Sequence, residues 1–122
     1  TATMLGLSFK PNTDDIRESS SIIMINSLIN RGVSINAYDP IANSQMAKII
    51  NSIKYFDNLY DAVSNVDAVV VMTEWNEFRS LDLNKIKSKM SGDVFLDTRN
   101  IISMDELSSF GFVYDNVGRI KK

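Results

Sequence analysis

Short apolar runs alternate along the chain with segments in which apolar residues recur every three or four positions. The first pattern is typical of buried strands, and the second is typical of amphipathic helices. Ile22, Ile25, Leu28 and Ile29 show the helical spacing. We expect strands at 3–9, 33–40, 53–56, 67–73, 93–98 and 112–118, and helices at 19–32, 43–50, 58–66, 83–90 and 103–111.

The alternation of strand and helix predicts an α/β fold, in which each helix returns the chain to the start of a parallel strand. Residues 68–72 are all apolar, as expected of a strand buried on both faces. We predict a Rossmann-like three-layer sandwich around a mostly parallel, doubly wound sheet with the order 3-2-1-4-5-6. A flavodoxin-like order is the alternative. No repeat or low-complexity linker appears, so residues 1–122 are interpreted as one domain.

The composition narrows the chemistry that this chain carries. Its formal net charge is −2, whereas domains that coat nucleic acid usually have a strong basic excess, so no nucleic-acid partner is expected. Cysteine and histidine are absent, which leaves no disulfide, thiol nucleophile, imidazole base or usual zinc ligand. No apolar run approaches the ~18 residues that span a bilayer. We expect a cytoplasmic protein with no membrane partner and no metal site.

Basic residues gather where the predicted strands end. In open α/β sheets, ligands bind beyond the carboxyl ends of the strands. Lys10 follows the first strand, Arg17 lies beside the first helix N-terminus, and Arg99 follows the fifth strand. Because helix N-termini and guanidinium groups both favour anions, these cations predict a site for a phosphorylated ligand. The fingerprint G-x-G-x-x-G is absent, so a dinucleotide bound in the standard way is not expected.

Plainer interpretations of the same charges remain open. Lys10 and Arg17 could be ordinary surface residues. Arg99 could form an ion pair with Asp97 or Glu74, with or without a ligand.

Other residues near the strand ends have structural interpretations. Asp14 and Asp15 are interpreted as capping and loop-ordering residues rather than metal ligands. Trp75 and Phe78 are interpreted as packing residues that shape the crevice. Asp39 stands where a dinucleotide-binding domain would hold a ribose, but without the glycine loop it is interpreted as the end of a strand.

Several motifs occur in an order and at a spacing that resemble one enzyme family. They are GLSFKPNTDDIRESSS, AYDP, TEWNEF, DTRN and a closing GF-x-Y-x-x-VGR, at residues 6–21, 37–40, 73–78, 97–100 and 111–119. Together they resemble the C-terminal, UDP-binding domain of the UDP-glucose 6-dehydrogenases, within the wider nucleotide-sugar dehydrogenase family. The resemblance covers almost the whole chain. FKPNTDD-x-R is a highly specific part of it, and TEW-x-x-F favours the UDP-glucose branch.

The resemblance implies roles for individual residues. Phe9 and Lys10 resemble the pair that lines the substrate site, and Arg99 resembles an arginine that contacts the UDP-sugar. Arg17 resembles the arginine that reaches bound NAD from this domain. Many relatives have glycine where Thr98 stands, which concerns the geometry of the loop beside Arg99.

The resemblance also implies the setting in which the domain acts. Enzymes of this family oxidise the 6-hydroxymethyl group of the sugar to a carboxylate in two NAD-dependent steps, which converts UDP-glucose to UDP-glucuronate. An N-terminal domain of the same polypeptide holds NAD, and the full-length protein is a homodimer. The catalytic cysteine lies outside this chain, so no catalytic residue is assigned here, and we expect the chain alone to turn over no substrate.

Three alternatives are kept. The first is a dehydrogenase for another nucleotide sugar, such as UDP-N-acetylmannosamine or GDP-mannose. The second is a receiver-type signalling domain, but that class has its acidic pair directly at the end of the first strand and a lysine after the fifth, where this chain has Asp97. The third is a structural module that holds a dimer together.

Overall fold

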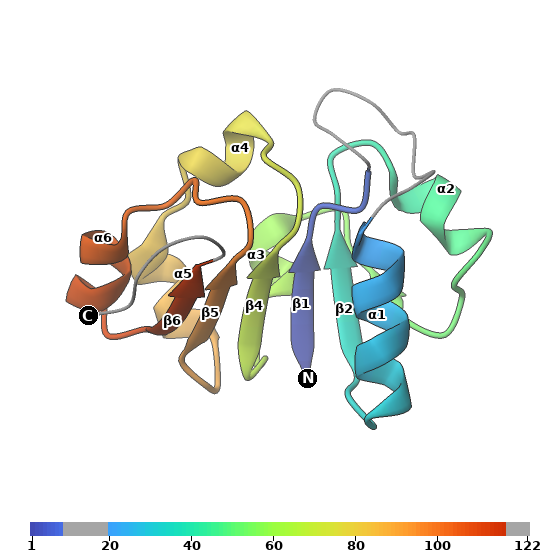
Figure 1. Ribbon diagram of the computed structural model, residues 1–122, viewed down its shortest axis with the longest axis horizontal. Helices are drawn as coiled ribbons and strands as arrows, with labels where there is room; N and C mark the ends of the chain where they lie inside the picture. Colours follow the sequence, from blue (N-terminus) through green and yellow to red (C-terminus); the bar gives the residue numbers. More distant parts are fainter. Residues whose placement is uncertain (9–19, 117–122) are drawn as a thin grey trace.

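Six strands form one sheet at the centre of the protein (Figure 1). This computed structural model describes residues 1–8 and 20–116. The strand order is β3-β2-β1-β4-β5-β6, and every neighbouring pair is parallel. The strands are β1 (Ala2–Leu5), β2 (Ile35–Tyr38), β3 (Lys54–Tyr55), β4 (Ala68–Val71), β5 (Val94–Asp97) and β6 (Val113–Asn116).

This order confirms the predicted Rossmann-like sheet, and the flavodoxin-like alternative is wrong. A receiver domain has the flavodoxin-like order, so the same finding argues against that class. The chain builds outward from β1 in one direction and then from β4 in the other. The switch point of the sheet therefore lies between β1 and β4, which pair in register from Ala2 and Ala68 to Leu5 and Val71.

Helices follow the strands as predicted, but most are shorter than the sequence pattern suggested. One helix, α4, was not predicted because its four residues are too few to show a helical period. The helices are α1 (Ser20–Asn30), α2 (Asn43–Ala47), α3 (Leu59–Ala62), α4 (Asn76–Arg79), α5 (Leu83–Lys89) and α6 (Met104–Ser109).

Two apolar clusters lie on the two faces of the sheet and make three layers. On one face, α1 and α2 contribute Ile25 and Met46 to a cluster that includes Val70 of β4. On the other face, the remaining helices pack against Val69 and Val71 of the same strand. Because β4 faces a cluster on each side, its unbroken apolar sequence is explained by burial on both faces.

The helix α1 shows how the predicted period translates into packing. Ile25 is fully buried, whereas Ile23 on the opposite side of the helix is 75% exposed. The buried Ser21 hydroxyl donates a 2.8 Å hydrogen bond to the carbonyl of Gly6, which ties the start of α1 to the end of β1. Gly32, two residues after the end of the helix, has φ +83°, a conformation that glycine adopts without strain.

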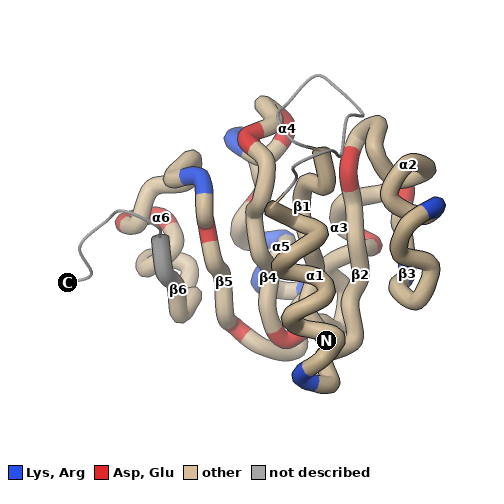
Figure 2. Tube along the Cα trace, turned by 45° about the vertical axis from the view of Figure 1, so that its right-hand side comes forward, with Lys and Arg blue, Asp and Glu red and all other residues tan. Residues whose placement is uncertain are grey.

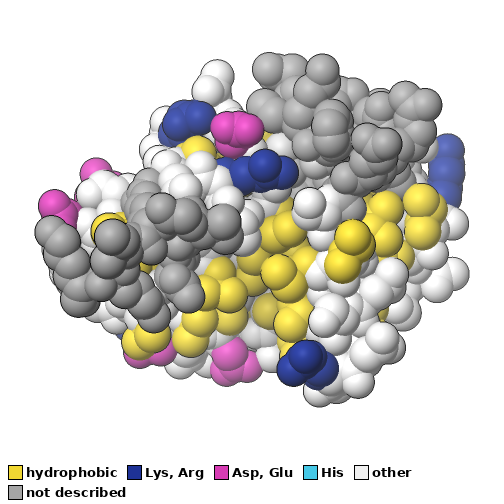
Figure 3. All heavy atoms as spheres, viewed as in Figure 1, with side chains coloured by type: hydrophobic (Ala, Val, Ile, Leu, Met, Phe, Trp, Pro, Cys, Tyr) yellow, Lys and Arg dark blue, Asp and Glu magenta, His cyan; other side chains and the backbone are white. Residues whose placement is uncertain are grey.

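On the face that carries α1, the described residues include partly exposed apolar side chains on β5 and β6. Leu96 is half-buried at the rim of the apolar cluster there, and Val113 on β6 is 56% exposed. Figure 3 shows hydrophobic side chains at the surface beside α1. β6 is an edge strand of the described sheet, so apolar side chains lie at this edge.

Candidate functional site

The carboxyl ends of all six strands meet at one edge of the sheet, because every pair is parallel. Figure 2 shows acidic positions at the carboxyl ends of β2 and β5, with a basic position shortly after the one on β5. These are Asp39, Asp97 and Arg99. Both aspartates are buried and Arg99 is exposed. At this edge, the acidic side chains therefore lie inside the protein and the basic side chain lies at its surface.

The switch point between β1 and β4 is closed by direct contacts. Gly6 has φ +100°, and a Cβ at this position would lie 2.5 Å from the Thr73 side chain. Only glycine fits here, because both the conformation and the space exclude a side chain. The buried Thr73 hydroxyl then donates a 3.0 Å hydrogen bond to the carbonyl of Ser8. The first residues after β1 are therefore fixed against the segment that follows β4.

Asp39 connects three segments of this edge. Its Oδ2 accepts hydrogen bonds from the backbone N–H of Leu7 at 2.8 Å and of Ser8 at 3.3 Å. The indole Nε1–H of Trp75 donates to the same oxygen at 3.2 Å. Asp39 is only 3% exposed. One buried carboxylate at the end of β2 thus holds both the chain that leaves β1 and the chain that leaves β4.

The other oxygen of Asp39 organises its own loop. Oδ1 accepts hydrogen bonds from the backbone N–H groups of Ile41 at 2.9 Å and Ala42 at 2.8 Å. In return, the Asn43 side chain accepts from the backbone N–H of Asp39 at 3.0 Å. Both carboxylate oxygens are thus engaged inside the protein, as expected of a residue that ends a strand and orders the turn after it.

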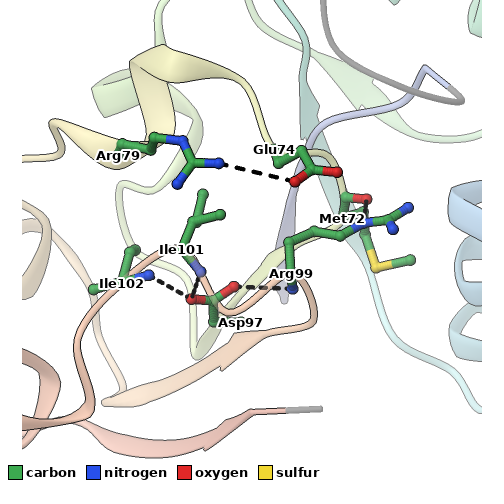
Figure 4. A network of polar contacts seen from close by, with 7 residues as sticks. All are labelled: Met72, Glu74, Arg79, Asp97, Arg99, Ile101 and Ile102. Atoms are coloured by element: carbon green, nitrogen blue, oxygen red, sulfur yellow. Dashed lines mark hydrogen bonds and ion pairs between the residues drawn. The ribbon is translucent and has the colours of Figure 1, made fainter. Parts of the chain in front are cut away.

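Asp97 plays a related role at the end of β5. Its Oδ1 accepts from the backbone N–H of Arg99 at 3.0 Å, and its Oδ2 accepts from those of Ile101 at 2.9 Å and Ile102 at 2.8 Å (Figure 4). Asp97 is fully buried. The loop that presents Arg99 is therefore wound around an internal carboxylate.

The Arg99 side chain reaches from β5 to the end of β4. Its Nε–H donates a 2.9 Å hydrogen bond to the carbonyl of Met72 (Figure 4). The next residue is Thr73, which contacts the carbonyl of Ser8. The dipeptide Met72–Thr73 therefore contacts both Arg99 and Ser8, which follows β1. Segments that are far apart in the sequence converge at the switch point.

The alternative ion pairs predicted for Arg99 are not what the described residues show. Glu74 pairs instead with Arg79 at 3.8 Å, and Asp97 contacts the backbone of Arg99 rather than its guanidinium. Within residues 1–8 and 20–116, no carboxylate forms an ion pair with Arg99. Its positive charge is thus held at the edge by a neutral carbonyl, and its role in binding stays a prediction.

The other residues predicted to bind ligands lie outside the described residues. This applies to Phe9, Lys10 and Arg17, and also to Asp14 and Asp15. Their roles stay predictions. The described chain stops at Ser8 just before them.

Trp75 and Phe78 are buried, at 9% and 0% exposure, as expected of packing residues. Phe78 packs edge-on against Tyr38 with ring centroids 6.3 Å apart. The Tyr38 hydroxyl also donates to the Glu77 carboxylate, with distances of 2.8 and 3.0 Å to its two oxygens. Burial, followed by the contact with Glu77, raises the pKa of Tyr38 well above its ordinary value. Helix α4 is thereby attached to the end of β2.

Sequence reasoning did not recognise the structural importance of Asp39, Thr73 and Asp97. A signal was present, because two strands end directly in aspartate, in AYDP and in FLDTRN. Aspartate at such a position often accepts hydrogen bonds from N–H groups two or three residues further on. The distant donors on Leu7 and Trp75 left no such local signal.

No helix among the described residues has the length and apolar character needed to cross a membrane. Among the same residues, no group of three or more acidic side chains could hold a metal ion.

Known proteins resemble this chain in both sequence and fold. A family model described as the UDP-binding domain of the UDP-glucose/GDP-mannose dehydrogenase family matches residues 3–104. The UDP-glucose 6-dehydrogenase of Rhizobium meliloti is 41% identical over 116 residues, which cover 95% of this chain and 26% of that protein. UDP-glucose 6-dehydrogenase TuaD of Bacillus subtilis is 35% identical over 98% of this chain and 26% of its own length. The chain spans about a quarter of these curated relatives.

Solved structures with a similar fold are also described as dehydrogenases of this kind. An NDP-N-acetyl-D-galactosaminuronic acid dehydrogenase from Methanosarcina mazei has a TM-score of 0.84 and 31% identity, over 98% of this chain and 25% of that one. A UDP-glucose dehydrogenase from Pyrobaculum islandicum has a TM-score of 0.77 and 28% identity, over 93% of this chain and 24% of that one. With the family match over most of its length, the chain belongs to the UDP-glucose/GDP-mannose dehydrogenase family and corresponds to the UDP-binding domain.

Proposed function

We propose that this chain is the C-terminal substrate-binding domain of an NAD-dependent UDP-glucose 6-dehydrogenase. The observation that carries the proposal is the convergence at Met72–Thr73. Arg99 donates to the carbonyl of Met72, while Thr73 donates to Ser8, the last described residue before Phe9 and Lys10. A diphosphate is recognised well by cations gathered on one edge, and a guanidinium gives it directional hydrogen bonds.

The choice of UDP-glucose as substrate rests on two observations. The relatives from Rhizobium meliloti and Bacillus subtilis are named UDP-glucose 6-dehydrogenases, and the TEW-x-x-F motif resembles that branch. Solved structures with a similar fold include proteins described as dehydrogenases of other sugars, among them a UDP-D-ManNAc dehydrogenase from Pyrococcus horikoshii. UDP-N-acetylmannosamine and GDP-mannose are therefore the alternative substrates.

The described residues do not form a standard NAD site in this sheet. The turn after β1 is filled by Thr73 against Gly6, and the Asp39 carboxylate bonds inward. We therefore assign NAD to the N-terminal domain of the same polypeptide, with Arg17 reaching it from this domain. In this proposal the domain binds and orients the sugar nucleotide, and the oxidation is carried out by residues elsewhere in a cytoplasmic homodimer.

Arg99 provides a direct test in the full-length protein. We expect Arg99→Ala to weaken the binding of UDP-glucose about 30-fold or more, since truncating one partner of a close charge pair is costly. Arg79→Ala is the matched control, because Arg79 is an exposed arginine nearby that already pairs with Glu74. Isothermal titration calorimetry measures both affinities, and the control should stay within about twofold of the wild type.

Two results would contradict the proposal. The first is equal affinity for UDP-glucose in the wild type and in Arg99→Ala. The second is NADH production by the wild type with UDP-N-acetylmannosamine or GDP-mannose but not with UDP-glucose, which would leave the family assignment intact and replace the sugar.

A further inference from the structure

We propose that Asp39 is a positioning residue for Arg99, acting through the segment that runs from Met72 to Trp75. The inference rests on the proposed function, because it assigns Asp39 to the same substrate site. Asp39 does not touch the ligand in this proposal. It fixes the carbonyl on which the Arg99 guanidinium is anchored.

The first connection is direct. The Nε1–H of Trp75 donates to Asp39 Oδ2 at 3.2 Å, so the indole spans from the end of β4 to the end of β2. Trp75 is buried, which limits its alternative conformations. Asp39 therefore holds one end of the segment 72–75.

The second connection passes through the end of β1. Asp39 Oδ2 accepts from the backbone N–H of Leu7 at 2.8 Å and of Ser8 at 3.3 Å. The carbonyl of Ser8 in turn accepts from the Thr73 hydroxyl at 3.0 Å. Asp39 is thus linked to the segment 72–75 at two points, one on each side of Glu74.

Arg99 is attached to the first residue of that segment. Its Nε–H donates to the carbonyl of Met72 at 2.9 Å, while its backbone N–H is held by Asp97. The backbone of Arg99 is therefore positioned by its own loop, but the direction of its side chain depends on Met72. A shift of the segment 72–75 would move the guanidinium without unfolding the loop that carries it.

A carboxylate is needed for this arrangement. Oδ1 is occupied by the N–H groups of Ile41 and Ala42, and Oδ2 by the donors from Leu7, Ser8 and Trp75. Asparagine has one acceptor oxygen and an NH₂ group that donates. In Asp39→Asn, the amide oxygen can therefore accept from only one of these two groups of donors. The NH₂ group then faces the other group of donors.

The test is a double-mutant cycle in the full-length protein with UDP as the probe. We expect Asp39→Asn to raise the Kd for UDP about tenfold, because small displacements of a positioned group are costly. The same change in an Arg99→Ala background should raise the Kd less than about twofold, since its target is gone. Trp75→Phe, which removes a single donor, should raise the Kd about threefold in the wild-type background.

Val63→Ala is the control for a general loss of stability. Val63 is fully buried directly after α3, outside the segments that contact Asp39 and Arg99 above. The Val63→Ala substitution should lower the melting temperature but leave the Kd for UDP unchanged. If Asp39→Asn leaves the Kd unchanged, or multiplies it equally with and without Arg99, Asp39 does not act through Arg99. If UDP does not bind the wild type, the proposed function fails instead.

Discussion

Asp39 and Asp97 occupy comparable places but do different work. Each is a buried aspartate at the carboxyl end of a strand, and each strand lies one position outward from the switch point. Among the described residues, the donors to Asp97 are backbone groups two, four and five residues further on. Asp39 adds donors on Leu7, Ser8 and Trp75, which lie 32, 31 and 36 residues away.

The difference separates a local loop from a junction between strands. The turn around Asp97 closes over a few residues, so it needs little more than its own segment in order to form. The contacts that Asp39 makes with Leu7, Ser8 and Trp75 exist only when β1, β2 and β4 have already assembled. Asp97 therefore orders the loop that carries Arg99, whereas Asp39 stabilises the assembled strands by joining the segments that follow β1 and β4.

The largest expected loss of stability comes from placing a side chain at Gly6, where β1 meets the segment that follows β4. Gly6→Ala places a Cβ 2.5 Å from the Thr73 side chain at a φ of +100°. Strain in this region and overpacking together should reduce the free energy of unfolding by about 4 kcal/mol. Urea denaturation measures the loss. Gly32→Ala is the matched control, because Gly32 also has positive φ but meets nothing within 4 Å, so it should cost clearly less.

The two aspartates should differ in the same assay. Removing either carboxylate leaves buried N–H groups without an acceptor, at about 1–3 kcal/mol for each group that water does not reach. We expect Asp39→Ala to reduce the free energy of unfolding by about 3 kcal/mol and Asp97→Ala by about 2 kcal/mol. Equal losses would show that the distant donors of Asp39 add nothing to its local ones.

The smallest effect concerns the residue before Asp39. Burial and the Glu77 contact raise the pKa of Tyr38, so the neutral phenol is favoured in the folded protein. A raised pKa gives stability that is fully present below the unfolded value of about 10 and is lost as pH rises above it. Glu77→Gln should lower the pKa of Tyr38, measured from the NMR shifts of the tyrosine ring carbons. An unchanged pKa would mean that the contact with Glu77 does not contribute to the shift.

The sequence predicted the sheet well because its signals are local. Apolar runs such as residues 68–72 and the regular alternation with helices were enough to predict a parallel, doubly wound sheet. The structure then decided between the predicted order and the flavodoxin-like alternative. The helix α4 was missed because Asn76–Arg79 is too short for a period. The same shortness hid the contact between Glu77 and Tyr38, which depends on where α4 packs.

The candidate site was predicted less completely. Arg99 lies at the carboxyl edge as its place after a strand indicated, but its anchor on Met72 could not be read from the sequence. Glu74 was a candidate partner for Arg99 and instead pairs with Arg79. Such choices depend on side-chain directions in three dimensions. Asp39 was interpreted as a strand end for the same reason, since its donors are remote in the chain.

The buried carboxylate of Asp39 limits any attempt to engineer this domain to bind a dinucleotide coenzyme. Restoring a glycine-rich turn would not be sufficient, because the amides of Leu7 and Ser8 already have an internal anion as their acceptor. An incoming phosphate would be repelled by that charge. Engineering of this kind would have to begin at position 39.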